Sequence, residues 1–130
     1  PFLEKRSYYF HKSLDIKLMN QAAIVMLDHD DFKCFSKSRT DVKTYLCDIQ
    51  EAYWKQNGSD LVFFIQANRF LRNMVRAIVG TLIEVGLKKI SIDDFESIIQ
   101  SRDRSEAGYS VPAHGLYLEK VYYPRHIFAV

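Results

Sequence analysis

Three arginines and an asparagine recur at steps of three or four residues in the middle of the sequence. A glycine and a glutamate continue the spacing, so the series consists of Arg69, Arg72, Asn73, Arg76, Gly80 and Glu84. On a helix, this spacing places all six residues on one stripe. Because a guanidinium offers forked donors that match a phosphate or a carboxylate, the stripe predicts contact with an anion.

The charge pattern alone leaves the identity of that anion open. Cations near a helix N-terminus oppose the helix dipole by about 0.3 to 1 kcal/mol each at exposed sites, so helix stability does not explain their position. A phosphate backbone or a carboxylate from another part of the protein would each fit. A solvated helix face is an equally good interpretation, because arginine has good helix propensity.

Other chemical patterns give little support to an independent hydrolase or a metalloprotein. Cys34 and Cys47 are thirteen positions apart and lack the CxxC spacing of zinc and redox sites, and the four histidines are scattered. The sequence has neither a nucleophile elbow nor a metal-ligand spacing. These patterns therefore do not predict a metal site, and we interpret both cysteines as reduced, buried thiols.

The composition is that of an ordinary globular chain. The sequence has 130 residues, 48% apolar and 26% charged, which predicts a single domain over residues 1–130. Eighteen Lys and Arg against 16 Asp and Glu give a formal charge of +2, so a basic surface requires clustering. No apolar run approaches the roughly 18 to 20 residues of a membrane span, and no leader opens the chain. We expect a soluble piece of a longer protein.

The elements that must position the arginines begin with a predicted helix over residues 15–27. Its apolar residues recur at steps of three and four, and Ser13 is available as its cap. Residues 1–12 have no clear period and are interpreted as an extended leading segment. Phe32 and Phe35 predict a short helical turn.

A hairpin is predicted after this turn. Tyr45, Cys47, Ile49 and Tyr53 alternate with polar residues, which is the period of a half-buried strand. Asn57-Gly58 then favours a tight reversal, because both residues tolerate positive φ. The apolar run over residues 61–65 supplies the returning strand.

The arginine stripe itself falls on the clearest predicted helix, residues 69–85, which Gly86 is placed to end. Residues 91–94, Ser-Ile-Asp-Asp, resemble a capping box that opens another helix through about Gln100. Residues 116–123 alternate as a strand that stops at Pro124.

This order of elements predicts an α+β fold, with a mainly antiparallel sheet and helices packed on one face. The opposite face of the sheet is then free to meet RNA or another domain.

Several motifs carry a family resemblance. Residues 70–80 read F-L-R-N-M-V-R-A-I-V-G, and residues 31–35 read D-F-K-C-F. Asp103-Arg104 is followed by P-A-H-G-L-Y-L over residues 112–118 and V-Y-Y-P over residues 121–124. In this order, the motifs resemble the C-terminal half of the tRNA pseudouridine synthase A (TruA) family. The sequence departs from the family at Asp30, where a histidine commonly precedes the Asp-Phe pair.

The resemblance implies a pseudouridine synthase-like half domain and an isomerase. Such an enzyme converts uridine to pseudouridine in the tRNA anticodon stem-loop, at tRNA positions 38–40, without cofactor or metal. The implied partner is tRNA, the implied assembly is a cytoplasmic homodimer, and the implied catalytic aspartate lies in an R-T-D-x-G-V-H-like segment of a preceding N-terminal half.

The resemblance also implies roles for single residues. Arg76 matches the arginine that pairs with the catalytic aspartate, and Leu116 and Leu118 match the apolar wall of the uracil pocket, although ordinary sheet core is the alternative for either leucine. The candidate RNA contacts are Arg69, Arg72, Asn73, Arg39 and His114. An ordinary surface-loop arginine is an equally good interpretation for Arg39, and a loop histidine without a role is the favoured one for His114. Arg104 is a weaker candidate, and a structural ion pair is the favoured interpretation for it.

The segment Arg39-Thr40-Asp41 imitates the catalytic motif. It continues with Val-Lys-Thr instead of x-Gly-Val-His and follows the Asp31-Phe32 pair, whereas the family aspartate precedes that pair. We therefore expect Asp41 to be non-catalytic. The alternative function is a non-catalytic RNA-binding or dimerisation module, in which the arginines only hold phosphates.

Overall fold

The computed structural model describes the backbone of residues 14–37, 43–58, 60–111, 117–122 and 125–129. Its α-helices are α2 (Ile16–Val25), α3 (Met74–Gly86) and α4 (Ile92–Ser101). Its strands are β1 (Ile49–Asn57), β2 (Asp60–Ala67), β3 (Tyr117–Tyr122) and β4 (Arg125–Ala129). Among the described residues, three short 3-10 helices are η1 (Met26–Asp28), η2 (Lys33–Phe35) and η3 (Arg104–Glu106).

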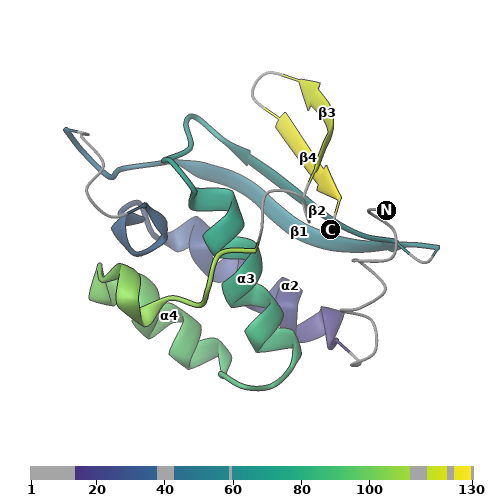
Figure 1. Ribbon diagram of the computed structural model, residues 1–130, viewed down its shortest axis with the longest axis horizontal. Coiled ribbons are helices and arrows are strands. Elements are labelled where there is room, and N and C mark those ends of the chain that lie inside the picture. Colours follow the sequence, from purple (N-terminus) through teal and green to yellow (C-terminus); the bar gives the residue numbers. More distant parts are fainter. Residues whose placement is uncertain (1–13, 38–42, 59, 112–116, 123–124, 130) are drawn as a thin grey trace.

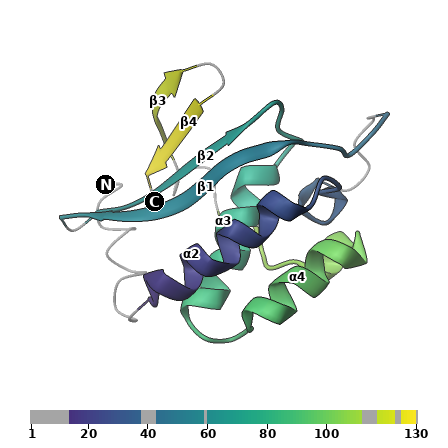
Figure 2. The ribbon, with the colours of Figure 1, turned by 180° about the vertical axis from the view of Figure 1, so that it is seen from behind.

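The strands form one antiparallel sheet in the order β1-β2-β4-β3. In both ribbon views the helices lie on one side of β1 and β2, and the β3–β4 hairpin extends away from them (Figure 1 and Figure 2). The predicted α+β fold, with a mainly antiparallel sheet and helices on one face, is confirmed. Within the described residues, no helix combines the length and the apolar character needed to cross a membrane.

The predicted hairpin is confirmed, with two differences in its first strand. Asn57 pairs with Asp60 at the turn, where Gly58 has φ 65°. The strand begins at Ile49 and excludes Tyr45 and Cys47.

A β-bulge in β1 separates residues that the alternating pattern grouped together. The pairing register of β1 shifts between Ile49 and Glu51, so Trp54 shares the buried face with Ile49. Tyr53 therefore lies on the opposite face, where its ring stacks on Phe64 with 4.8 Å between the centroids. The single inserted residue therefore places the Tyr53 side chain on the sheet face opposite to the predicted one.

The helix termini follow local capping chemistry. Helix α2 is capped by Asp15, whose Oδ1 accepts a hydrogen bond from Leu18 N at 3.1 Å, so the prediction of Ser13 as the cap was wrong. The capping box of α4 is confirmed, because Ser91 Oγ accepts from Asp94 N and Asp94 Oδ2 accepts from Ser91 N. Residues 1–12, predicted to be extended, lie outside the described residues.

Strand β4 was missed by the sequence prediction, which ended the last strand at Pro124. Residues Arg125–Ala129 pair with β2 on one side and with β3 on the other, so β4 occupies an interior position of the sheet. The segment has only five residues, so its apolar alternation is too short to identify it as a separate strand from the sequence.

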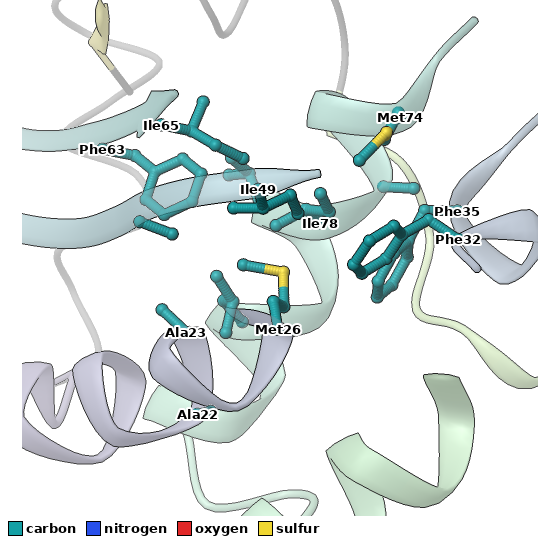
Figure 3. Packing of buried hydrophobic residues seen from close by; sticks show 14 of the residues in the cluster. Ala22, Ala23, Met26, Phe32, Phe35, Ile49, Phe63, Ile65, Met74 and Ile78 are labelled. Atoms are coloured by element: carbon teal, nitrogen blue, oxygen red, sulfur yellow. The ribbon is translucent and has the colours of Figure 1, made fainter. Parts of the chain in front are cut away.

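The core lies between the sheet and the helices, where side chains from distant segments meet (Figure 3). Phe32, Phe35, Phe63, Met26 and Ile78 are fully buried. Burying a side chain of this size contributes about 1.5 to 3 kcal/mol. The two phenylalanines of the D-F-K-C-F segment therefore anchor η2 to the core, and the same core holds α3. The predicted burial of both cysteines is also confirmed.

Candidate active site

The backbone before α3 changes direction at Asn73. This residue has φ 69° and ψ 2°, and α3 begins at Met74. Asparagine tolerates this left-handed conformation better than most residues. The prediction of a helix over residues 69–85 was therefore wrong at its start. Arg69 and Arg72 precede the helix, and Arg76 lies in its first turn.

Arg69 is a structural cross-link in addition to any other role. Its Nη1 donates hydrogen bonds to Thr44 O at 3.1 Å and to Leu46 O at 3.3 Å. Nearby, Asp48 N donates to Asn68 Oδ1 at 2.8 Å. These bonds tie the segment before β1 to the segment after β2, and they leave Arg69 half-buried.

Arg72 lies at the surface with its side chain exposed. Its carbonyl oxygen accepts a hydrogen bond from Lys37 N at 3.0 Å, which fixes the backbone of both residues. Among the described residues, its guanidinium has no hydrogen-bond or ion-pair partner. Arg72 is therefore a cation that can meet a ligand from solvent.

Arg76 is half-buried and is oriented by one backbone group. Its Nε donates to Val111 O at 2.8 Å, and Val111 N donates back to Arg76 O at 3.1 Å. Within the described part of the chain, no carboxylate lies within ion-pair distance of this guanidinium. The bond at Nε fixes the plane of the group and leaves its two Nη groups as donors.

The segment that holds Arg76, residues 108–111, packs closely on α3, and we call it the 108–111 loop. A Cβ atom at Gly80 would overlap the carbonyl oxygen of Tyr109, so only glycine permits this approach. Thr81 Oγ1 accepts from Gly108 N at 3.0 Å and donates to Ala77 O at 2.8 Å. Gly80 and Thr81, the two α3 residues that contact the loop, are both buried.

Ser110 joins two further polar side chains to the loop. Asn73 Nδ2 donates to Ser110 Oγ at 2.6 Å, and Arg104 Nη2 donates to the same oxygen at 2.9 Å. Arg104 Nη1 also donates to Gly108 O at 3.0 Å. Arg104 thus has a structural role, through hydrogen bonds instead of the expected ion pair.

The structure brings together part of the predicted stripe. Asn73, Arg76 and Gly80 contact the 108–111 loop, and a Cβ at Gly108 would lie 2.9 Å from Glu84 Oε2. Sequence reasoning missed the bonds that Ser110 and Val111 make in this site. The glycines at positions 80 and 108 were the available signal, because glycine marks close backbone approach.

Some predicted site residues cannot be placed. Arg39, His114 and Leu116 lie outside the described residues, as does the Arg39-Thr40-Asp41 segment. The backbone of Leu118 lies in β3 and pairs with Phe128 of β4, but its side chain is not described.

The cysteines do not supply a nucleophile. Burial raises the pKa of the Cys34 thiol to about 12, and nearby Asp31 acts in the same direction. Burial likewise raises the pKa of Cys47. Both groups are protonated at neutral pH, whereas a nucleophilic cysteine requires the thiolate. The described residues contain no group of three or more metal-ligating side chains.

Comparison with known proteins identifies the family. A family model described as tRNA pseudouridine synthase matches residues 22–124. A tRNA pseudouridine synthase A of Parabacteroides distasonis is 52% identical over 130 residues, covering 100% of this chain and 52% of the relative.

Two further relatives named tRNA pseudouridine synthase A are similar over almost the whole chain. The Porphyromonas gingivalis protein is 54% identical over 131 residues, covering 98% of this chain and 52% of the relative. The Bacillus subtilis protein is 39% identical over 125 residues, covering 95% of this chain and 51% of the relative. The chain thus spans about half the length of these relatives. It belongs to the tRNA pseudouridine synthase family.

Proposed function

We propose that this chain is the C-terminal half of a tRNA pseudouridine synthase that isomerises uridine to pseudouridine in the tRNA anticodon stem-loop. The observation that carries the proposal is the 52% identity to a relative named tRNA pseudouridine synthase A, which extends over 100% of this chain and 52% of the relative. The preceding half then supplies the catalytic carboxylate.

The reaction exchanges one bond to the ribose for another. The bond between C1′ and N1 of uracil breaks, the base turns, a bond forms between C1′ and C5, and the proton on C5 is lost to solvent while N1 gains one. The reaction needs no oxidant or reductant. A uridine in a stack cannot be reached, so it must be flipped out at a cost of a few kcal/mol. The carboxylate acts covalently or as a nucleophile-like group.

Arg76 is the residue of this chain that we assign to the carboxylate. Its Nε is bound to Val111 O, so its Nη groups are oriented by the 108–111 loop and not by solvent. An opposite charge within about 4 to 6 Å lowers the pKa of a carboxyl group by roughly one to three units. Arg76 would thus keep the incoming aspartate ionised and aligned.

The remaining candidate residues are proposed as tRNA contacts or as the wall of the uracil pocket. Arg72 is the best placed contact among the described residues, because its side chain is exposed and has no partner there. Arg69 and Asn73 already make internal hydrogen bonds, so RNA would use their remaining donors. Arg39 and His114 remain candidate contacts. The proposed uracil wall remains Leu116 and Leu118.

The family resemblance also supports a homodimer that acts on tRNA in the cytoplasm. In such a dimer, one tRNA would contact both subunits.

The test compares the 130-residue chain with the same chain extended by its upstream reading frame. Tritium release from C5-labelled uridine in tRNA measures the reaction. We expect release from the extended chain and none from the 130 residues alone, and we expect the upstream frame to encode an R-T-D-x-G-V-H-like segment. If the extended chain binds tRNA but releases no tritium, the alternative function, a non-catalytic RNA-binding module, is correct instead.

A further inference from the structure

A second cationic region lies apart from Arg76, at the contact between η2 and η3. It encloses a pocket of about 430 Å³. One side of the pocket is formed by Lys33, Ser36, Lys37 and Tyr45, and the other by residues 102–105. We call it the η2–η3 pocket.

The lining of the η2–η3 pocket is strongly basic. Two lysines and two arginines face one carboxylate, that of Asp103. Asp103 Oδ1 already accepts hydrogen bonds from Ser105 N at 3.0 Å and from Ser105 Oγ at 2.7 Å. Because these bonds hold the pKa of Asp103 below its ordinary value, its charge is committed to capping η3. The cations that line the pocket therefore outnumber its one carboxylate.

Two of the pocket cations, Arg104 and Lys33, contact neutral groups. Arg104 is held by Gly108 O and Ser110 Oγ, which are both neutral acceptors. Lys33 Nζ lies 5.5 Å from the centroid of the Tyr45 ring. Arg102 differs from these two, because its Nε lies 3.4 Å from Asp31 Oδ2, with both groups partly exposed to solvent.

The basic surface continues beyond the pocket. Lys33, Lys37 and Arg102 are exposed, and Lys37 N is hydrogen-bonded to the carbonyl of the exposed Arg72. At its other side, the pocket shares a residue with the candidate active site. Arg104 and Asn73 both donate to the hydroxyl of Ser110.

We propose that the η2–η3 pocket binds a backbone phosphate of the RNA substrate, next to the nucleotide that reaches Arg76. This inference rests on the proposed function for the identity of the RNA. Adjacent exposed cations suit a polymer with regularly spaced phosphates, because each cation can neutralise one phosphate and release its counterions. A small free anion would occupy the pocket alone and leave Arg72 without a ligand.

The experiment measures tRNA affinity over a series of salt concentrations for the chain extended by its upstream half. The test variant is Lys33→Gln with Lys37→Gln. The matched control is Lys17→Gln with Lys89→Gln, which removes the same charge at exposed positions outside the pocket. We expect the test variant to bind about ten-fold more weakly at low salt, with a salt slope smaller by roughly 0.7 to 0.9 per lost phosphate contact. The control should keep the wild-type slope.

Three outcomes overturn the inference, and they are distinguishable. If wild-type protein neither binds tRNA nor releases tritium, the proposed function fails together with the pocket. If wild type is active and the test variant matches the control in affinity and slope, only the pocket assignment fails. If inorganic phosphate alone raises the melting temperature of wild type but not of the test variant, while the salt slopes agree, the pocket is a site for a free anion.

Discussion

The two cationic regions of this chain are built in different ways. Arg76 is half-buried, bonded to a backbone carbonyl, and covered by a loop that packs against helix α3 without room for a Cβ atom. The η2–η3 pocket has exposed lysines and an exposed arginine on its rim. One region fixes the direction of a single guanidinium, whereas the other gathers charge over an open surface.

The difference separates two tasks that a cation can perform. Orienting a reacting carboxylate requires geometry, and small displacements reduce the rate strongly. Attracting a polyanion requires charge, tolerates movement, and weakens with salt. Substitutions near Arg76 should therefore change turnover and stability, and substitutions at the surface should change affinity and its salt dependence.

The largest effect is expected for Arg76→Ala in the chain joined to its upstream half. The carboxylate would lose its partner in the transition state, so turnover at saturating tRNA should fall by about 10²- to 10³-fold, as when one donor to a reacting oxygen is removed. The dissociation constant for tRNA should change much less. Single-turnover tritium release and equilibrium binding measure the two quantities separately.

Arg76→Lys is the matched control for charge. A lysine keeps the cation but cannot donate through a fixed fork, so it should recover only part of the turnover. If Arg76→Ala weakened tRNA binding and left turnover at saturating tRNA intact, the two regions would not have the separate tasks described above. Arg76 would then be a phosphate contact.

The next largest effect is expected for Gly80→Ala. The new methyl group would collide with the Tyr109 carbonyl, and overpacking of this kind costs about 1 to 3 kcal/mol of unfolding free energy. The displaced loop should also reduce turnover. Urea unfolding measures the change in unfolding free energy. Gly58→Ala is the control for turnover, because a Cβ at Gly58 meets no atom within 4 Å, although its φ of 65° costs about 1 to 2 kcal/mol of unfolding free energy with an L side chain. Turnover should survive the Gly58 substitution, and equal losses of turnover in both variants would argue against a close fit of the loop.

A smaller effect is expected for Ser110→Ala, which removes the hydroxyl shared by Asn73 and Arg104. A hydrogen bond of this type contributes about 0.5 to 1.5 kcal/mol, so the free energy of unfolding should fall by about that amount. The same variant tests whether the two cationic regions are energetically coupled through Ser110. If Ser110 links the two regions, Ser110→Ala should lower both turnover and tRNA affinity, whereas a change in turnover alone would show that the regions act independently.

The smallest effect on the fold is expected for Arg72→Ala. Unfolding free energy should change by less than about 0.5 kcal/mol, because the side chain is at the surface and has no partner among the described residues. The salt slope of tRNA binding should fall by roughly 0.7 to 0.9, which corresponds to one phosphate. A loss of turnover at saturating tRNA would instead indicate that Arg72 acts in the candidate active site.

The sequence predicted the elements better than their boundaries. Apolar periodicity located helix α3, but the same period runs back through Phe70 and Leu71. The left-handed backbone at Asn73, which ends that continuity, has no signature in hydrophobic spacing. The β-bulge after Ile49 was hidden for a related reason, because an inserted residue changes facing without changing composition.

The candidate site was predictable only in part. The motif indicated Arg76, but Val111, which orients it, lies 35 positions away in the sequence. Ser110 and Arg104 entered the site through contacts with the loop that no local pattern reports. The basic pocket was also missed as a unit, because Lys33, Lys37 and Arg104 are brought together by folding.

Position 73 shows how narrow the choice of amino acid can become when backbone and side chain make separate demands. A glycine would accept the φ of 69° but offer nothing to Ser110. An aspartate would also tolerate that backbone, yet its ionised carboxylate has no N–H to give and would add a negative charge beside a serine already bound to Arg104. Asparagine combines tolerance of this backbone with an N–H donor on a short side chain, so saturation mutagenesis should find it the least replaceable polar residue of the segment.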